Sequence, residues 1–189
     1  MPPKIRVTKE QIVTAGFDIV RSAGHEALNV RSAAAHIGCS TQPVMYQFET
    51  VADMKAAVYE MADKFHSEYI MQPMPADDPM LSIGVRYVMF GAEEKNLFRF
   101  LFQTDKFSGM GFDRLFESDE LAPVYAVLSG AAGIPLTECR DVFKSIFISA
   151  HGLASLLANN AVEFRRDYTE KILTSAFYGA VGAAGGGRS

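Results

Sequence analysis

The segment from Gly38 to Thr50, GCSTQPVMYQFET, carries several side chains that could contact DNA, although only one of its residues is charged. If the residues after Ser40 form a helix, four side chains share one face, because residues three and four apart are helix neighbours. They are Thr41, Gln42, Met45 and Tyr46. A glutamine amide can pair with adenine through two hydrogen bonds, and threonine or tyrosine can reach a base methyl group or a phosphate. The segment therefore fits a DNA-reading helix, but an ordinary helical hairpin with a solvated polar face fits it equally well.

Sequence patterns that signal catalysis or metal binding are missing. The four histidines form no H-E-x-x-H or similar ligand pair: His25, His36, His66 and His151. The G-M-G at 109–111 lacks the third glycine and the preceding strand of a nucleotide-binding loop, and no G-x-S-x-G occurs. We therefore expect no enzyme, no cofactor and no metal. His151 lies in an apolar stretch, where a histidine is expected to be a core residue or to hydrogen-bond a ligand.

The overall charge restricts how the chain could contact nucleic acid. Its 189 residues carry a net charge of −4, so any basic DNA-binding surface must be local. Cys39 and Cys139 have no metal-ligand spacing, and residues 1–6 do not resemble an export signal, so we expect free thiols and a cytoplasmic protein. The apolar stretch 145–162 is marginal for crossing a bilayer, and we expect a buried helix there and no membrane partner.

Helical periodicity runs through nearly the whole chain, and no period-two strand pattern stands out. The first helix is predicted to begin after Thr8, where T-K-E-Q forms a capping box, and to stop at Gly24. Prolines between 72 and 79 mark a linker. A second helix is predicted between the cap Asn29 and Gly38, a third after the cap Ser40, and a fourth of about five turns from Thr50. Further helices are predicted at about 80–94, 95–103, 119–131, 137–161 and 167–181. The predicted fold class is all-α.

Two of these helices have the features of a helix-turn-helix unit. Gly38 can adopt the positive φ that a tight turn requires, and the small side chain of Ala34 allows the helices to cross closely. Val44 and Phe48, four residues apart, would dock the third helix on the first two. Pro43 falls at the third helical position, where its missing amide hydrogen costs little.

The order of these segments resembles the TetR family of transcriptional regulators. The resemblance rests on V-R-S-A-A-A-H-I-G, C-S-T-Q-P-V-M-Y-Q-F and a long fourth helix, and more loosely on Y-V-M-F-G-A-E-E-K-N-L-F-R-F-L-F and the later H-G-L-A. It implies an N-terminal helix-turn-helix DNA-binding domain at 1–55. It also implies a C-terminal helical domain for effector binding and dimerisation at 56–184, with a linker at about 72–79 and a flexible tail at 185–189.

The same resemblance, with the residue types, gives a predicted interface for double-stranded operator DNA. Its residues are Lys4, Arg6, Lys9, Arg31, Ser40, Thr41, Gln42, Pro43, Tyr46, Thr50 and Lys55. Met45 and Val51 stand where family members usually carry a tyrosine and a lysine that contact phosphate. Residues 1–55 hold six basic and five acidic side chains, a net of +1. Because phosphate contacts supply much of the affinity for DNA, we expect modest binding that depends on helix N-termini and backbone amides.

The C-terminal part is rich in phenylalanine, and the resemblance implies an effector cavity in it for a hydrophobic or amphipathic small molecule. The predicted lining is Met61, Phe65, Tyr87, Phe90, Phe102, Phe107, Phe112, Phe147 and His151. The last two helices are expected to pair with their copies in a homodimer. The predicted interface residues are Ser149, Gly152, Leu153, Leu157, Leu173, Phe177 and Ala180.

These expectations describe a ligand-responsive homodimeric repressor that binds a palindromic operator. The alternative is a small-molecule-binding or scaffolding protein whose helix-turn-helix has lost useful DNA affinity.

Overall fold

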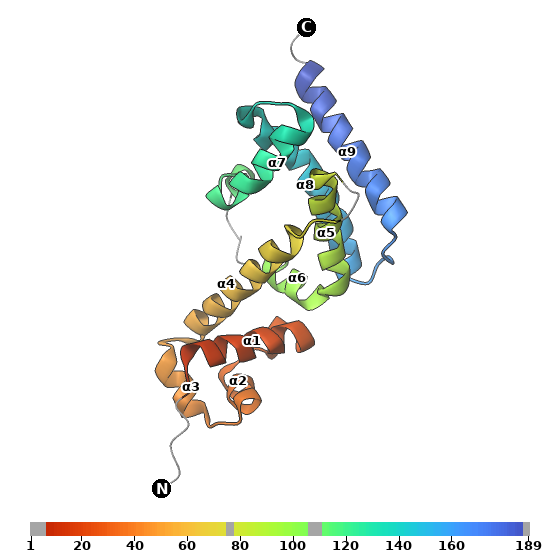
Figure 1. Cartoon of the computed structure of the whole chain (residues 1–189). Coiled ribbons are helices and arrows are strands. Elements are labelled where there is room, and N and C mark those ends of the chain that lie inside the picture. Colours follow the sequence, from red (N-terminus) through yellow and green to blue (C-terminus); the bar gives the residue numbers. More distant parts are fainter. Residues whose placement is uncertain (1–6, 75–77, 106–110, 187–189) are drawn as a thin grey trace. The chain divides into compact units, whose positions relative to one another are not determined.

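The computed structural model describes residues 7–74, 78–105 and 111–186, and every regular element in these ranges is a helix (Figure 1). The predicted all-α class is therefore confirmed for the described part of the chain. The chain forms two compact units: Met1–Ser67 with Glu94–Thr104, called unit 1, and Glu68–Glu93 with Asp105–Ser189, called unit 2.

Unit 1 begins with α1 (Lys9–Ala23), whose start is fixed by a reciprocal cap. The Thr8 hydroxyl accepts a hydrogen bond from the Gln11 amide, and the Gln11 side chain accepts one from the Thr8 amide, as predicted. Six residues on one face of the helix are buried: Ile12, Ala15, Gly16, Phe17, Ile19 and Val20. A short 3₁₀ turn, η1 (His25–Ala27), follows the stop at Gly24.

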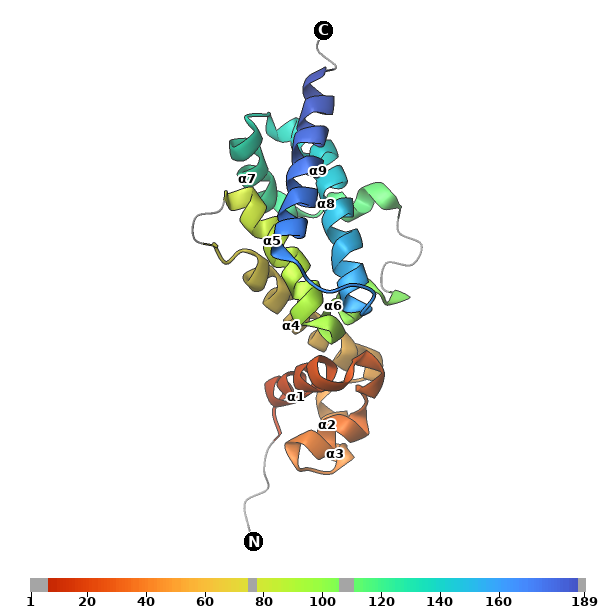
Figure 2. The same ribbon diagram turned by 90° about the vertical axis from the view of Figure 1, so that its right-hand side faces the viewer.

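The helix-turn-helix unit consists of α2 (Val30–Ile37) and α3 (Thr41–Gln47), which lie beside α1 in both whole-chain views (Figures 1 and 2). Asn29 caps α2 by accepting hydrogen bonds from the Arg31 and Ser32 amides. Gly38 ends α2 in the left-handed region at φ 79°, which an L-amino acid with a side chain rarely adopts. The turn therefore has the conformation that the sequence predicts.

Two further helices complete unit 1: most of α4 (Val51–Ile70) and α6 (Lys95–Phe102). The phenol of Tyr59 on α4 donates to the carbonyl of Leu101 on α6 at 3.1 Å, and both residues are buried. α6 also packs against α1, where the Arg21 guanidinium pairs with the Glu94 carboxylate through two hydrogen bonds. The chain thus returns to its N-terminal unit after building part of the other one.

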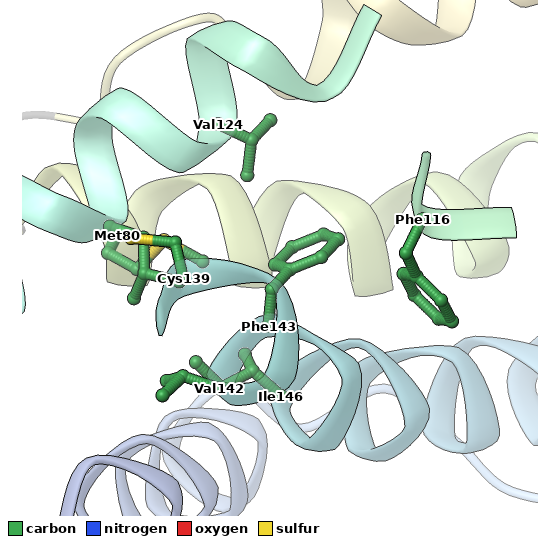
Figure 3. Packing of buried hydrophobic residues seen from close by; sticks show 8 residues of the cluster. Met80, Phe116, Val124, Cys139, Val142, Phe143 and Ile146 are labelled. Carbon is green, nitrogen blue, oxygen red and sulfur yellow. The ribbon is translucent and has the colours of Figure 1, made fainter. Parts of the chain in front are cut away.

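Unit 2 is built from α5 (Pro79–Glu93), α7 (Ala122–Ala132), α8 (Leu136–Ala158) and α9 (Arg166–Gly186). Two 3₁₀ turns, η3 (Phe112–Phe116) and η4 (Asp119–Leu121), precede α7. In its core, Met80 and Cys139 lie side by side, and Val124 of α7 and Phe143 of α8 point toward one another (Figure 3). Among the described helices, only α8 is long and apolar enough to cross a membrane, a property that it shares with core helices of water-soluble proteins.

Gly91 of α5 lies directly against the backbone of α8 at Ala154. A Cβ atom added at Gly91 would lie 2.7 Å from the Ala154 carbonyl oxygen and 2.9 Å from its Cα. Both are backbone atoms, so they cannot rotate away as a side chain can. The absence of a side chain at Gly91 is therefore a condition of the α5–α8 packing.

Two sequence-based details differ from the structure. The helix predicted at 119–131 starts with the 3₁₀ turn η4. α9 continues beyond 181 to Gly186, two residues into the segment predicted as a tail, and Val181 and Ala184 pack against the core of unit 2.

Replacement of Gly91 by alanine should lower the free energy of unfolding by about 1–3 kcal/mol, because α5 and α8 would have to separate. The control is Gly130→Ala on α7, where an added Cβ meets nothing within 4 Å and the helix should gain up to about 1 kcal/mol. Urea unfolding followed by circular dichroism measures both. Equal stability of the two variants would contradict the assigned contact.

Candidate nucleic-acid interface

The predicted DNA-reading face lies on α3. This helix has one buried side and one exposed side, as the sequence indicates. Val44 is 1% exposed and Phe48, directly after the helix, is 9% exposed, so these two side chains hold α3 in unit 1. The opposite side is open to solvent, with Thr41 and Gln42 exposed, Met45 65% exposed and Tyr46 78% exposed. Ser40, which precedes the helix, is also exposed, and Pro43 is half-buried.

Two residues of this open face are joined to each other. The Gln42 side-chain amide donates a hydrogen bond from Nε2 to the Tyr46 hydroxyl oxygen at 3.0 Å, across one turn of the helix. The spacing of four residues makes them neighbours, and this pairing could have been anticipated from the sequence. It restricts the amide plane of Gln42, which would otherwise rotate freely in solvent.

The predicted phosphate contacts have different surroundings. Arg31 and Lys55 are exposed on α2 and α4, while the Lys9 ammonium lies 5.1 Å from the centre of the Phe48 ring. The Thr50 hydroxyl is engaged in capping α4, since it accepts from the Asp53 amide and donates to the Asp53 carboxylate. The predicted contacts Lys4 and Arg6 lie outside the described residues.

The exposed surface on and beside α3 also includes two apolar side chains. Met45 and the 45% exposed Val51 occupy positions from which a tyrosine and a lysine could donate hydrogen bonds to phosphate. Neither side chain can do so. The exposed cations nearby lie instead on α1, α2 and α4, at Lys9, Arg31 and Lys55.

The predicted effector-lining residues are divided between the two units. In unit 2, the Tyr87 hydroxyl and His151 Nδ1 are 2.8 Å apart, and the Phe147 ring stacks on the His151 ring with 5.3 Å between centroids. Phe90 is fully buried and packs edge-on against Tyr69. Phe107 lies outside the described residues, as does the side chain of Phe112.

The remaining predicted lining residues, Met61, Phe65 and Phe102, belong to unit 1. Phe65 packs edge-on against Phe17, and Phe102 packs against Phe98 and His66. Burial lowers the pKa of His66 to about 4, so this imidazole is neutral at physiological pH. Phe65 and Phe102 thus contribute to the aromatic packing of unit 1.

The Tyr87–His151 pair combines a buried phenol with a half-buried imidazole. Burial raises the pKa of the Tyr87 phenol and lowers the pKa of His151, so both groups are held in their uncharged forms. A neutral imidazole has one donor and one acceptor nitrogen. The Tyr87 hydroxyl is bonded to Nδ1, one of these two nitrogens.

Residues predicted at a subunit interface fall into two groups. Leu157 and Leu173 are each 3% exposed and pack inside unit 2, and the Gly84 backbone approaches the Leu173 side chain closely. Phe177 and Ala180 are partly buried against the same core. Gly152 is exposed and Ser149 and Leu153 are half-buried, so these three border the open side of α8.

Apolar side chains and glycines are also exposed on α9, which lies beside α8 in unit 2 (Figure 2). Ile148 is 51% exposed, Leu156 48% exposed and Tyr178 69% exposed. An added Cβ at Gly152, Gly179 or Gly182 would meet nothing within 4 Å. We call this surface the α8–α9 face.

One polar cluster in unit 2, formed by Tyr69, Arg86 and Glu93, was not predicted from the sequence. Tyr69 donates a hydrogen bond to the Glu93 carboxylate at 2.6 Å, and the Arg86 guanidinium lies 5.5 Å from the centre of the Tyr69 ring. Burial, assisted by Glu93, raises the pKa of the Tyr69 phenol. Arg86 interrupts the apolar sequence of α5, which is the signal that could have identified it. Within the described ranges, no three His, Cys, Asp or Glu side chains are grouped to hold a metal ion.

The fold is shared with a known regulator. A crystal structure of a transcriptional regulator from Rhodococcus sp. Rha1 superposes with a TM-score of 0.60, covering 94% of this chain and 97% of the other. The sequences are 16% identical, so the likeness establishes the fold. No protein-family model matches the sequence, and no curated protein matches it.

Proposed function

We propose that the protein is a DNA-binding transcriptional regulator of the TetR type. The observation that carries the proposal is the exposed polar side of α3, held on a helix-turn-helix whose turn is left-handed at Gly38. Thr41, Gln42 and Tyr46 contact base edges in the major groove. Arg31, Lys55 and Lys9 contact phosphates, together with Lys4 and Arg6 ahead of α1.

The regulator acts as a homodimer through the α8–α9 face. An apolar helix surface of this kind is stabilised by a second apolar surface, and small residues allow two helices to approach closely. A two-fold dimer presents two copies of α3 and matches a palindromic operator. The dimer thereby doubles the number of phosphate contacts, which compensates for the few cations on each protomer.

A small amphipathic effector binds near Tyr87, Phe147 and His151 in unit 2. The stacked rings supply apolar contact area, and the imidazole supplies a hydrogen-bonding group that fixes the orientation of the ligand. α4 joins the two units along the chain and is the element through which binding could be communicated to α3. The effector releases DNA, as in a repressor, if it binds the DNA-incompetent state more tightly.

The alternative is a ligand-binding or scaffolding protein without useful DNA affinity. It is favoured by a specific observation, the exposure of Met45 and Val51 where phosphate-binding side chains would be expected. Failure of the wild-type protein to enrich any duplex from a random pool would favour this alternative.

Gln42→Ala should cost about 1–3 kcal/mol of binding free energy on the specific site and much less on unrelated DNA, because a base-pairing amide is lost. Electrophoretic shifts with a selected duplex, or with the DNA upstream of the protein's own gene, measure the difference. Glu60→Ala, an exposed change on α4, serves as the control. Equal losses on both DNAs would mean that Gln42 positions the protein without reading a base.

Gly152→Leu should weaken the dimer by at least about tenfold in dissociation constant, because the new side chain enters the space of the partner helix. Within the protomer that position is open, so the fold should be retained. Sedimentation velocity at micromolar concentration gives the oligomeric state, with Gly130→Leu on α7 as the control. A monomeric wild type, or an unchanged dimer in the Gly152 variant, would contradict dimerisation through the α8–α9 face.

An amphipathic aromatic probe, 1-anilinonaphthalene-8-sulfonate, should bind saturably and lower occupancy of the selected duplex. His151→Leu should weaken the probe by about tenfold, since the hydrogen-bonding group and its ring are lost while the Tyr87 and Phe147 rings remain. Fluorescence titration measures the affinity, with Glu60→Ala as the control. Identical titrations of the wild type and the His151 variant would mean that Tyr87, Phe147 and His151 only pack in the core and bind no effector.

A further inference from the structure

The hydrogen bond between Gln42 and Tyr46 changes what the Gln42 amide can offer to DNA. A free glutamine amide has two N–H donors and one carbonyl oxygen acceptor. One N–H is used by the Tyr46 hydroxyl at 3.0 Å, on a face where both side chains are exposed. One donor and one acceptor remain for a base.

The two purines differ in how well they match this remaining pair. In the major groove adenine presents the N7 acceptor beside the N6 amino donor, whereas guanine presents two acceptors, N7 and O6. Adenine can therefore use both remaining groups of Gln42. Guanine would need two N–H donors, and Gln42 could supply the second only by giving up its bond to Tyr46.

We propose that Tyr46 sets the base preference of Gln42, so that α3 favours adenine over guanine at the base pair that Gln42 faces. The inference rests on the proposed DNA-binding function and deepens it. Tyr46 is a positioning residue in this role, because it acts on the base through Gln42. Its own hydroxyl hydrogen is not used in the bond from Gln42 and can be donated to a phosphate oxygen.

The pair gains strength when DNA is bound. In solvent, an exposed hydrogen bond between two side chains competes with water and contributes little. Between α3 and the floor of the groove, water is displaced and the effective dielectric constant falls, so breaking the bond becomes more costly. Binding to guanine requires this hydrogen bond to break, whereas binding to adenine leaves it intact.

Tyr46→Phe tests the proposal, since it removes the acceptor and leaves the ring. The probe is a duplex that the full-length protein selects from a random pool, with the adenine that depends on Gln42 located by comparing the wild type with Gln42→Ala. Binding is then measured on that duplex with A·T, G·C or I·C at the position. Inosine presents the major-groove acceptors of guanine without its minor-groove amine.

In the wild type the A·T duplex should bind best, and Tyr46→Phe should reduce the preference over both G·C and I·C by about three- to tenfold. In the Gln42→Ala background the same change should leave the preference unaltered. A uniform loss on all three duplexes would overturn the proposal and make Tyr46 a phosphate contact only. Failure of the wild type to select any duplex would instead overturn the proposed function, so the two failures are distinguishable.

Discussion

α3 has seven residues, too few for a helix to be stable in water without tertiary contacts, and its shape therefore depends on the burial of Val44 and Phe48. These two anchors determine which residues face solvent. Because they are four positions apart and lie on one side of α3, the side chains of Thr41, Gln42, Met45 and Tyr46 are directed outward as one surface. The left-handed turn at Gly38 then sets where that surface lies relative to α2. Any chemistry on α3 follows from this docking.

The helix-turn-helix could be predicted because its determinants are local. The caps at Thr8, Asn29 and Thr50 and the turn at Gly38 are each specified within four residues of sequence. The Tyr87–His151 contact joins positions 64 apart, and no periodicity reveals such a pairing. Its two members could be proposed only as separate residues of an aromatic-rich region.

Burial in the C-terminal helices was predicted less well for a related reason. The sequence of α8 is apolar on most sides, so periodicity alone could not decide which side a neighbour in the protomer covers. Leu157 and Ile148 are equally apolar, yet the first is buried and the second half exposed. The choice is made by the contact between α5 and α8 at Gly91 and Ala154, which lie far apart in sequence. The same contact leaves the α8–α9 face uncovered.

The pairing of Arg21 with Glu94 and the packing of α6 on α1 have a consequence for the order in which the protein folds during synthesis. Leu97 and Leu101 of α6 are fully buried in unit 1, although the chain must pass through α5 before it reaches them. The N-terminal helices therefore leave the ribosome with the surface of α1 that α6 covers still exposed, and unit 1 is completed only after residue 104 is made. Because unit 1 is discontinuous in sequence, its completion depends on the prior synthesis of α5, the first helix of the other unit.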